Sequence, residues 1–118
     1  MSELFSLIED KFSEEYNENW WTYSIQFEFI FNKSVINYIT ITDYIWKDKK
    51  GREMITKELI LELLTKMNGG NLKPMKYEGN REPYEWEVFY QDKPYRLFFW
   101  FKDNTNNHLW IRNCHRID

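Results

Sequence analysis

Three arginines and a histidine near the C-terminus are the residues of this chain best suited to catalysis. They are Arg96, Arg112, His115 and Arg116. An arginine can stabilise negative charge on a phosphate in a transition state, and a histidine can act as a general acid or base. A metal-free ribonuclease requires a set of this kind, so phosphodiester cleavage is one candidate activity. Arginine and histidine are also common on late strands that have no catalytic role.

Other catalytic chemistries find little support in the chain. The two histidines, His108 and His115, form no HxxxH or HExxH pattern, and the single cysteine excludes CxxC. We therefore expect no metal site and no cofactor. Neither a glycine-rich phosphate loop nor a GxSxG motif is present. Cys114 and His115 are neighbours, but adjacent residues of a strand point to opposite faces, so a nucleophilic Cys–His pair is not expected.

An antiparallel meander is predicted to position the C-terminal residues. Apolar residues alternate with glutamates over 84–90, and a tight turn at Asp92–Lys93 leads into an almost wholly apolar strand over 95–102. A polar turn over 103–107 precedes a last strand over 108–112. The middle strand is apolar on both faces, so we expect it to be central in the sheet.

Pairing across these turns predicts a second sheet face, opposite the core, that carries aromatic and charged residues together. The expected rows are Glu85, Trp100 and Trp110, and beside them Glu87, Phe98 and Arg112. This mixture is typical of a binding surface, where exposed tryptophans act as anchors. The alternative is that an N-terminal helix covers this face.

The first half of the chain is expected to supply two helices and a hairpin. The predicted elements are a short helix over 2–13 capped by Ser2, strands over 25–31 and 35–46 joined by the turn Asn32–Ser34, a charged loop over 47–53, a longer helix after Thr56 ended by Gly69–Gly70, and a loop over 71–83. The expected fold is α+β. It is a single domain over 1–118, with about five antiparallel strands (a hairpin plus a three-stranded meander), one long helix and one short helix.

Composition and charge favour a binding protein. Aromatic residues make up 19% of the chain, with six Trp, and no Ala is present. Residues 1–45 hold eight acids and two bases, net −6, and the remainder is net +3. An acidic segment suits a basic partner, whereas proteins that bind nucleic-acid phosphates usually show a basic excess. No apolar run is long enough to span a membrane, and the acidic start is unlike a signal peptide, so we expect a cytoplasmic protein without membrane contact.

The second half resembles RelE- and HigB-type toxins of the barnase–EndoU–colicin–RelE ribonuclease group. The resemblance lies in a helix (ITKELILELLTKMNGG), a Lys/Pro loop (NLKPMKY), a strand with glutamates (YEWEVFY), a strand that opens with Tyr-Arg (YRLFFWF) and a closing strand that ends in His-Arg (HLWIRNCHR). It implies that Arg96 and Arg116 contact phosphate and that Lys76 is a loop lysine.

In size, charge and tryptophan content, the whole chain resembles bacterial immunity proteins of toxin–immunity pairs, including contact-dependent inhibition systems. That resemblance implies a protein that blocks a cognate nuclease toxin domain, with no direct contact to nucleic acid. The residues expected to bind the toxin are Glu14, Glu15, Glu18, Glu85, Glu87, Phe98, Trp100, Trp110 and Arg112. The ribonuclease toxin and an accessory domain of a phage or plasmid remain the alternatives, and the oligomeric state is not indicated.

Overall fold

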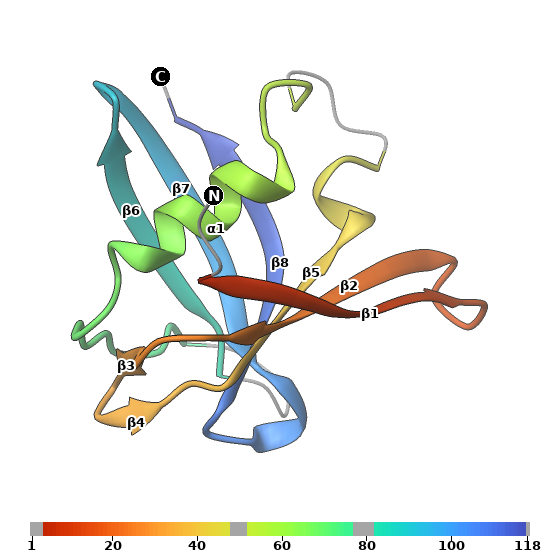
Figure 1. Ribbon diagram of the computed structural model, residues 1–118. Coiled ribbons are helices and arrows are strands. Elements are labelled where there is room, and N and C mark those ends of the chain that lie inside the picture. Colours follow the sequence, from red (N-terminus) through yellow and green to blue (C-terminus); the bar gives the residue numbers. More distant parts are fainter. Residues whose placement is uncertain (1–3, 48–51, 77–81, 118) are drawn as a thin grey trace.

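A six-stranded sheet dominates the computed structural model, which describes residues 4–47, 52–76 and 82–117 (Figure 1). Its neighbouring strands are antiparallel, except β5 and β8, which are parallel. Across the sheet the strands are β1 (Phe5–Ser13), β2 (Glu18–Ile25), β5 (Tyr38–Thr42), β8 (His108–Arg116), β7 (Lys93–Phe101) and β6 (Tyr84–Tyr90). The α+β class is confirmed, but the prediction of about five antiparallel strands with two helices is wrong.

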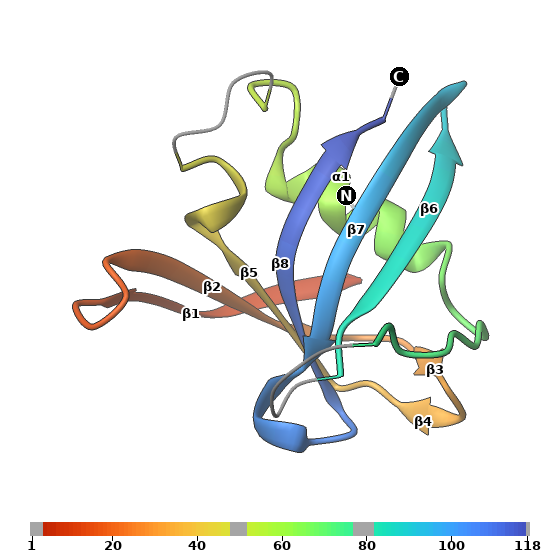
Figure 2. The same cartoon turned by 180° about the vertical axis from the view of Figure 1, so that it is seen from behind.

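Helix α1 (Lys57–Thr65) packs on one face of this sheet, and Figure 2 shows it behind β6, β7 and β8. The Thr56 hydroxyl accepts the Leu59 N–H at 3.0 Å, so the predicted cap is confirmed. Gly69 has a φ of +85°, a conformation that glycine adopts without strain just after a helix. Two short 3₁₀ turns, η1 (Asp43–Ile45) and η2 (Lys102–Asn104), follow β5 and β7. Within the described ranges, no helix has the length and apolarity needed to cross a bilayer.

The core lies between α1 and the sheet. Ile60, Leu63 and Leu64 of the helix are fully buried, and so are the helix-facing residues of the central strands: Ile39, Ile41, Leu97, Phe99, Leu109 and Ile111. A small hairpin of β3 (Ile30–Phe31) and β4 (Ser34–Val35) closes one end. Its Phe31 ring lies 5.3 Å from Tyr84 and 5.6 Å from Phe99, centroid to centroid. Burial of such a side chain contributes about 1.5–3 kcal/mol.

The predicted N-terminal helix is wrong, because Phe5–Ser13 is strand β1 (Ser2, its expected cap, lies outside the described residues). The helical spacing of the apolar residues finds no surface to bury against: Ile8 and Phe12 are 55% and 54% exposed. Strand β2, rich in aromatic and β-branched residues, offers unpaired backbone groups, and pairing with β1 satisfies them.

The predicted hairpin of strands 25–31 and 35–46 is also wrong in its extent. Strand β2 ends at Ile25, and only Ile30–Phe31 and Ser34–Val35 pair with each other. The apolar alternation in this stretch arises because the chain passes over the end of the core, where Phe29 and Phe31 are fully buried. The turn itself is confirmed, since Asn32 and Lys33 have φ values of +52° and +64°.

The meander is present with a corrected register. The β6–β7 turn is at Gln91–Asp92, whose φ values are +51° and +63°, one residue before the predicted position. Each β6 residue therefore pairs with a β7 residue two positions earlier than predicted, so that Glu85 is opposite Phe98 and Glu87 is opposite Arg96. A shift of two residues changes the rows but keeps each side chain of β6 and β7 on its predicted face. Between β7 and β8, Trp100 lies opposite Trp110 as predicted, and a bulge near Arg112 then shifts the pairing.

Candidate partner-binding face

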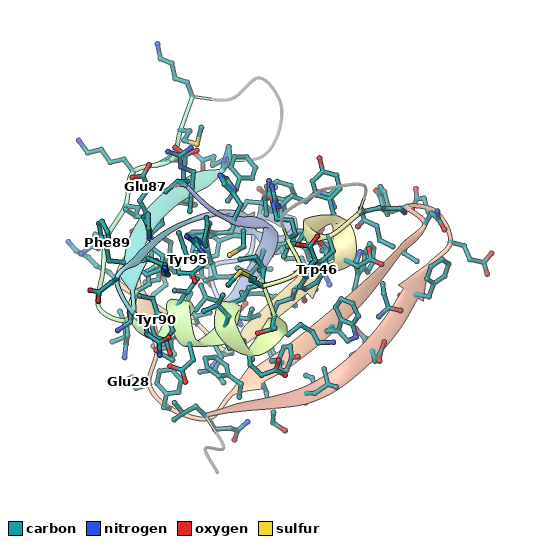
Figure 3. All side chains as sticks on the ribbon, turned by 90° about the horizontal axis from the view of Figure 1, so that it is seen from above. Glu28, Trp46, Glu87, Phe89, Tyr90 and Tyr95 are labelled. Carbon is teal, nitrogen blue, oxygen red and sulfur yellow. The ribbon has the colours of Figure 1, made fainter. Side chains whose placement is uncertain are left out.

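The face of the main sheet opposite α1 is the candidate site, and we name it the open face. Helix α1 lies on the other side of the sheet in Figure 2, and the short turns η1 and η2 reach the open face through Tyr44 and Lys102. Figure 3 shows Glu87 and Phe89 pointing away from α1, whereas Tyr90 lies beside the helix. The side chains of the open face include Trp20, Glu85, Glu87, Phe89, Arg96, Phe98, Trp100, Trp110, Arg112 and His115.

One row of charged and polar residues crosses the three C-terminal strands: Glu87 on β6, Arg96 on β7 and His115 on β8. Arg96 Nη2 lies 2.6 Å from Glu87 Oε2, and its Nε lies 3.9 Å from Glu85 Oε2. The hydrogen bond to Glu87 raises the pKa of Arg96. Arg96, Glu85 and Glu87 have side-chain exposures of 34%, 39% and 54%, so their ion pairs contribute little to stability, and the two carboxylates can be reached by a partner.

The surroundings of His115 favour its neutral form. Burial is the largest cause that lowers its pKa, and the positive charges of Arg52 and Arg96 lower the pKa further. Its Nδ1 is buried and has no hydrogen-bond partner among the described residues. At pH 7 this imidazole therefore suits a base or an acceptor better than a general acid.

Glu18 and Arg112 form a closed cluster rather than an exposed contact surface. Glu18 is 4% exposed, and its Oε1 and Oε2 accept hydrogen bonds from Arg112 Nη1 at 3.0 and 2.9 Å. Trp20 Nε1 donates to the same carboxylate at 3.0 Å, and the Arg112 guanidinium lies 3.8 Å from the centre of the Tyr44 ring. The cluster holds the start of β2 against β8, so both charges are already engaged.

Aromatic side chains fill the centre of the open face. Trp110 is only 9% exposed, because the Trp20 ring packs edge-to-face on it with centroids 4.9 Å apart. The expectation that Trp110 is solvent-exposed is therefore wrong. Trp100 and Phe98 are half-buried, with centroids 6.0 Å apart, and Phe89 is 73% exposed. Trp20 was not among the residues predicted for this face, although the alternation of polar and apolar residues over 18–25 indicates its strand.

Beside the tryptophans lies a buried chain of polar side chains. Thr22 Oγ1 and Thr40 Oγ1 are 2.7 Å apart, and Thr40 Oγ1 is 2.7 Å from His108 Nε2. Burial, followed by the charge of Lys102, lowers the pKa of His108 to about 4, so this histidine is neutral at pH 7 and can share the hydrogen bond as donor or acceptor.

The remaining predicted residues are not gathered at one point. Glu14 and Glu15 are exposed in the turn between β1 and β2. Arg116 pairs with buried Tyr95, so strand alternation directs it away from the face that His115 occupies. Lys76 is exposed in the loop between α1 and β6. Of the four candidate catalytic residues, only Arg96 and His115 are paired neighbours.

Comparison with known proteins adds no relative: no family model, curated protein or solved structure matches this chain. In the described parts of the chain, no group of three His, Cys, Asp or Glu side chains is arranged to hold a metal ion. The open face can offer aromatic rings, exposed carboxylates and guanidinium groups that are already paired with acids.

Proposed function

We propose that this protein is an immunity protein that binds a bacterial nuclease toxin domain and blocks it. The observation that carries the proposal is the open face, where half-buried Phe98 and Trp100 stand beside the exposed carboxylates of Glu85 and Glu87. Phe and Trp side chains each bury about 150–250 Å² when covered, and such aromatic anchors supply most of the binding energy at protein interfaces.

The charges of the face favour a protein partner over a nucleic acid. The guanidinium groups of Arg96 and Arg112 are engaged by carboxylates, so they are poorly placed to neutralise phosphates. Exposed acids lie at the tip of the β1–β2 hairpin, at Glu14 and Glu15, and along β6. A nuclease that grips nucleic acid presents lysines and arginines, and these acids complement such a surface.

The mechanism is steric and electrostatic. The aromatic centre docks on the toxin and excludes water, while the carboxylates at its margin pair with cationic side chains that would otherwise hold the substrate's phosphates. No covalent step and no cofactor is required. Because exposed charges steer the encounter, the association rate should fall as the salt concentration rises.

The test is binding to the C-terminal domain of the protein encoded by the adjacent gene, measured by titration calorimetry. Trp100→Ala should weaken binding about tenfold or more, the range of an anchor residue. Val35→Ala is the matched control, because Val35 is 49% exposed on β4, outside the open face. Charge reversal at Glu85 and Glu87 should also weaken binding. Unchanged affinity in all of these variants would remove the open face from the proposal.

A metal-free ribonuclease toxin is the second candidate, and one observation favours it. Glu87, Arg96 and His115 stand side by side on three adjacent strands, which is a compact set of carboxylate, guanidinium and imidazole groups. Expression of the chain alone in a bacterial host separates the two candidates. A ribonuclease should arrest growth, and His115→Ala should relieve the arrest. An immunity protein should leave growth unchanged and protect cells that produce its toxin.

A further inference from the structure

Strand β1 is an edge of the main sheet with unusually apolar side chains. It is nine residues long and pairs with β2 on one side only. Every residue from Ser6 to Phe12 is exposed, including Leu7 at 50% and Ile8 at 55%. Natural edge strands are usually short or protected by lysine, proline or bulges. Here one bulge at Ile8 and one lysine protect a long edge.

The first part of the edge presents unpaired backbone groups. The Gln26 N–H donates to the Leu4 carbonyl at 2.8 Å, so the backbone of Leu4 faces β2. In an antiparallel pair, successive residues point their N–H and C=O groups alternately toward the partner strand and away from it. The backbone groups of Phe5 and Leu7 therefore point outward.

The same alternation holds beyond the bulge. The Ile25 N–H donates to the Asn37 carbonyl at 2.9 Å, which directs the odd-numbered residues of β2 toward β5 and away from β1. Asp10 and Phe12 are opposite odd-numbered residues of β2, so their own N–H and C=O groups also point outward. The edge can thus accept hydrogen bonds from an added strand, and donate to it, on both sides of the bulge.

We propose that β1 accepts an added strand from another protein, an extended segment in which apolar and basic residues alternate. The apolar residues would cover Leu7 and Phe12, which are on the same side of β1. The basic residues, on the other side of the added strand, fit Glu9 and the exposed Glu14 and Glu15 at the tip of the hairpin, against one exposed lysine, Lys11. This surface is distinct from the open face and does not depend on the proposed function.

A second copy of this chain is a poorer occupant, because the hairpins of two copies carry the same charge. An antiparallel pair centred on Asp10 would place this carboxylate opposite itself and Glu9 opposite Lys11, and the exposed Glu14 and Glu15 of both hairpins would leave the pair strongly negative. Like charges directly opposite on neighbouring strands are destabilising. Charge complementarity therefore selects a basic strand.

The probe is a synthetic nine-residue peptide of alternating Lys and Val, compared with a peptide in which Glu replaces each Lys. Amide hydrogen exchange on the full chain reports the outcome. The Lys/Val peptide should slow exchange at Leu7, Asp10 and Phe12 about tenfold at saturation. The Glu/Val peptide should leave it unchanged. Equal effects of both peptides, or no effect of the first, overturn the proposal.

Phe12 provides a matched pair of variants. Phe12→Pro removes an outward N–H and keeps the β1–β2 ladder, so it should abolish peptide binding. Phe12→Ala loses only apolar contact and should retain weakened binding. Trp100→Ala should leave peptide binding intact, which separates this surface from the open face. If the Phe12→Pro variant binds the Lys/Val peptide as well as the Phe12→Ala variant does, the proposal is wrong. It is also wrong if the free chain is a dimer and Phe12→Pro makes it monomeric, because a second copy would then be the occupant of this edge.

Discussion

Replacing Arg112 with Met should destabilise the fold strongly, because it leaves the Glu18 carboxylate buried without its cation. Glu18 has a side-chain exposure of 6%, against 26% for Arg112. Because the Glu18 carboxylate is buried, water can replace the hydrogen bonds of Arg112 only in part. Trp20 Nε1 would remain as a donor to this carboxylate. The methionine side chain preserves apolar contact near Tyr44 while it removes the charge.

The magnitude follows from the burial of the pair. Removal of one partner from a fully buried ion pair costs about 3–5 kcal/mol. The partial exposure of Arg112 lowers the expectation to about 2–3 kcal/mol, including about 0.5–1 kcal/mol for its contact with the Tyr44 ring. Domains of this size have about 5–15 kcal/mol of stability in total. With a urea slope of about 1–3 kcal/mol per molar, the midpoint should fall by about 0.7–3 M.

The assay is urea unfolding followed by tryptophan fluorescence, in a double-mutant cycle with Glu18→Gln. The glutamine keeps an acceptor for Trp20 Nε1 and removes the charge. The double variant should therefore be more stable than the sum of the two single effects predicts, by about 1–3 kcal/mol. A coupling below about 0.5 kcal/mol, or an Arg112→Met variant as stable as the parent, would refute the buried ion pair as a determinant of stability.

Three further predictions concern the groups beneath the open face. Thr40→Val should cost about 1–3 kcal/mol in urea unfolding, because an isosteric apolar side chain leaves Thr22 Oγ1 and His108 Nε2 without their shared partner. The pKa of His108 is about 4 in the fold against 6.5 for the free side chain, so the unfolded chain binds more protons between these values. Stability should fall as the pH drops through that window, and His108→Gln should flatten the slope; an equal slope in both proteins contradicts the assignment. Burial raises the pKa of Cys114 to about 12, so a thiol reagent should modify it only after denaturation, and rapid labelling of the native protein would contradict its place in the core.

Local sequence patterns predicted the helix and the meander because each depends on contacts close in sequence. The spacing of apolar residues after Thr56 and the cap itself describe a helix that packs by one face. Alternation over 84–90 and 95–101 assigned side chains to faces correctly, even though the turn is one residue earlier. A two-residue shift in pairing preserves the faces, so the prediction of the open face was insensitive to this error.

Long-range pairing decided what the local pattern could not. The apolar spacing over 4–12 suits a helix, yet β2 provides an edge that takes this segment as a strand. The parallel contact of β5 with β8 joins residues about 70 positions apart, and no turn signal marks it. Burial at the site was also decided by this packing, since Trp20 arrives from β2 to cover Trp110.

The amino-acid sequence by itself therefore determined which side chains of β6 and β7 share a strand face, because that depends only on the two-residue period of an extended chain. In β8 the bulge overrides this period and brings His115 onto the open face. The sequence also determined the helix cap and the presence of the meander. The tertiary structure alone decided which charges are engaged and which are exposed. Glu18 and Arg112 are 94 positions apart and neutralise each other only once β2 and β8 are brought together. Proximity of this kind arises from the packing of the whole sheet, so no local pattern can report it.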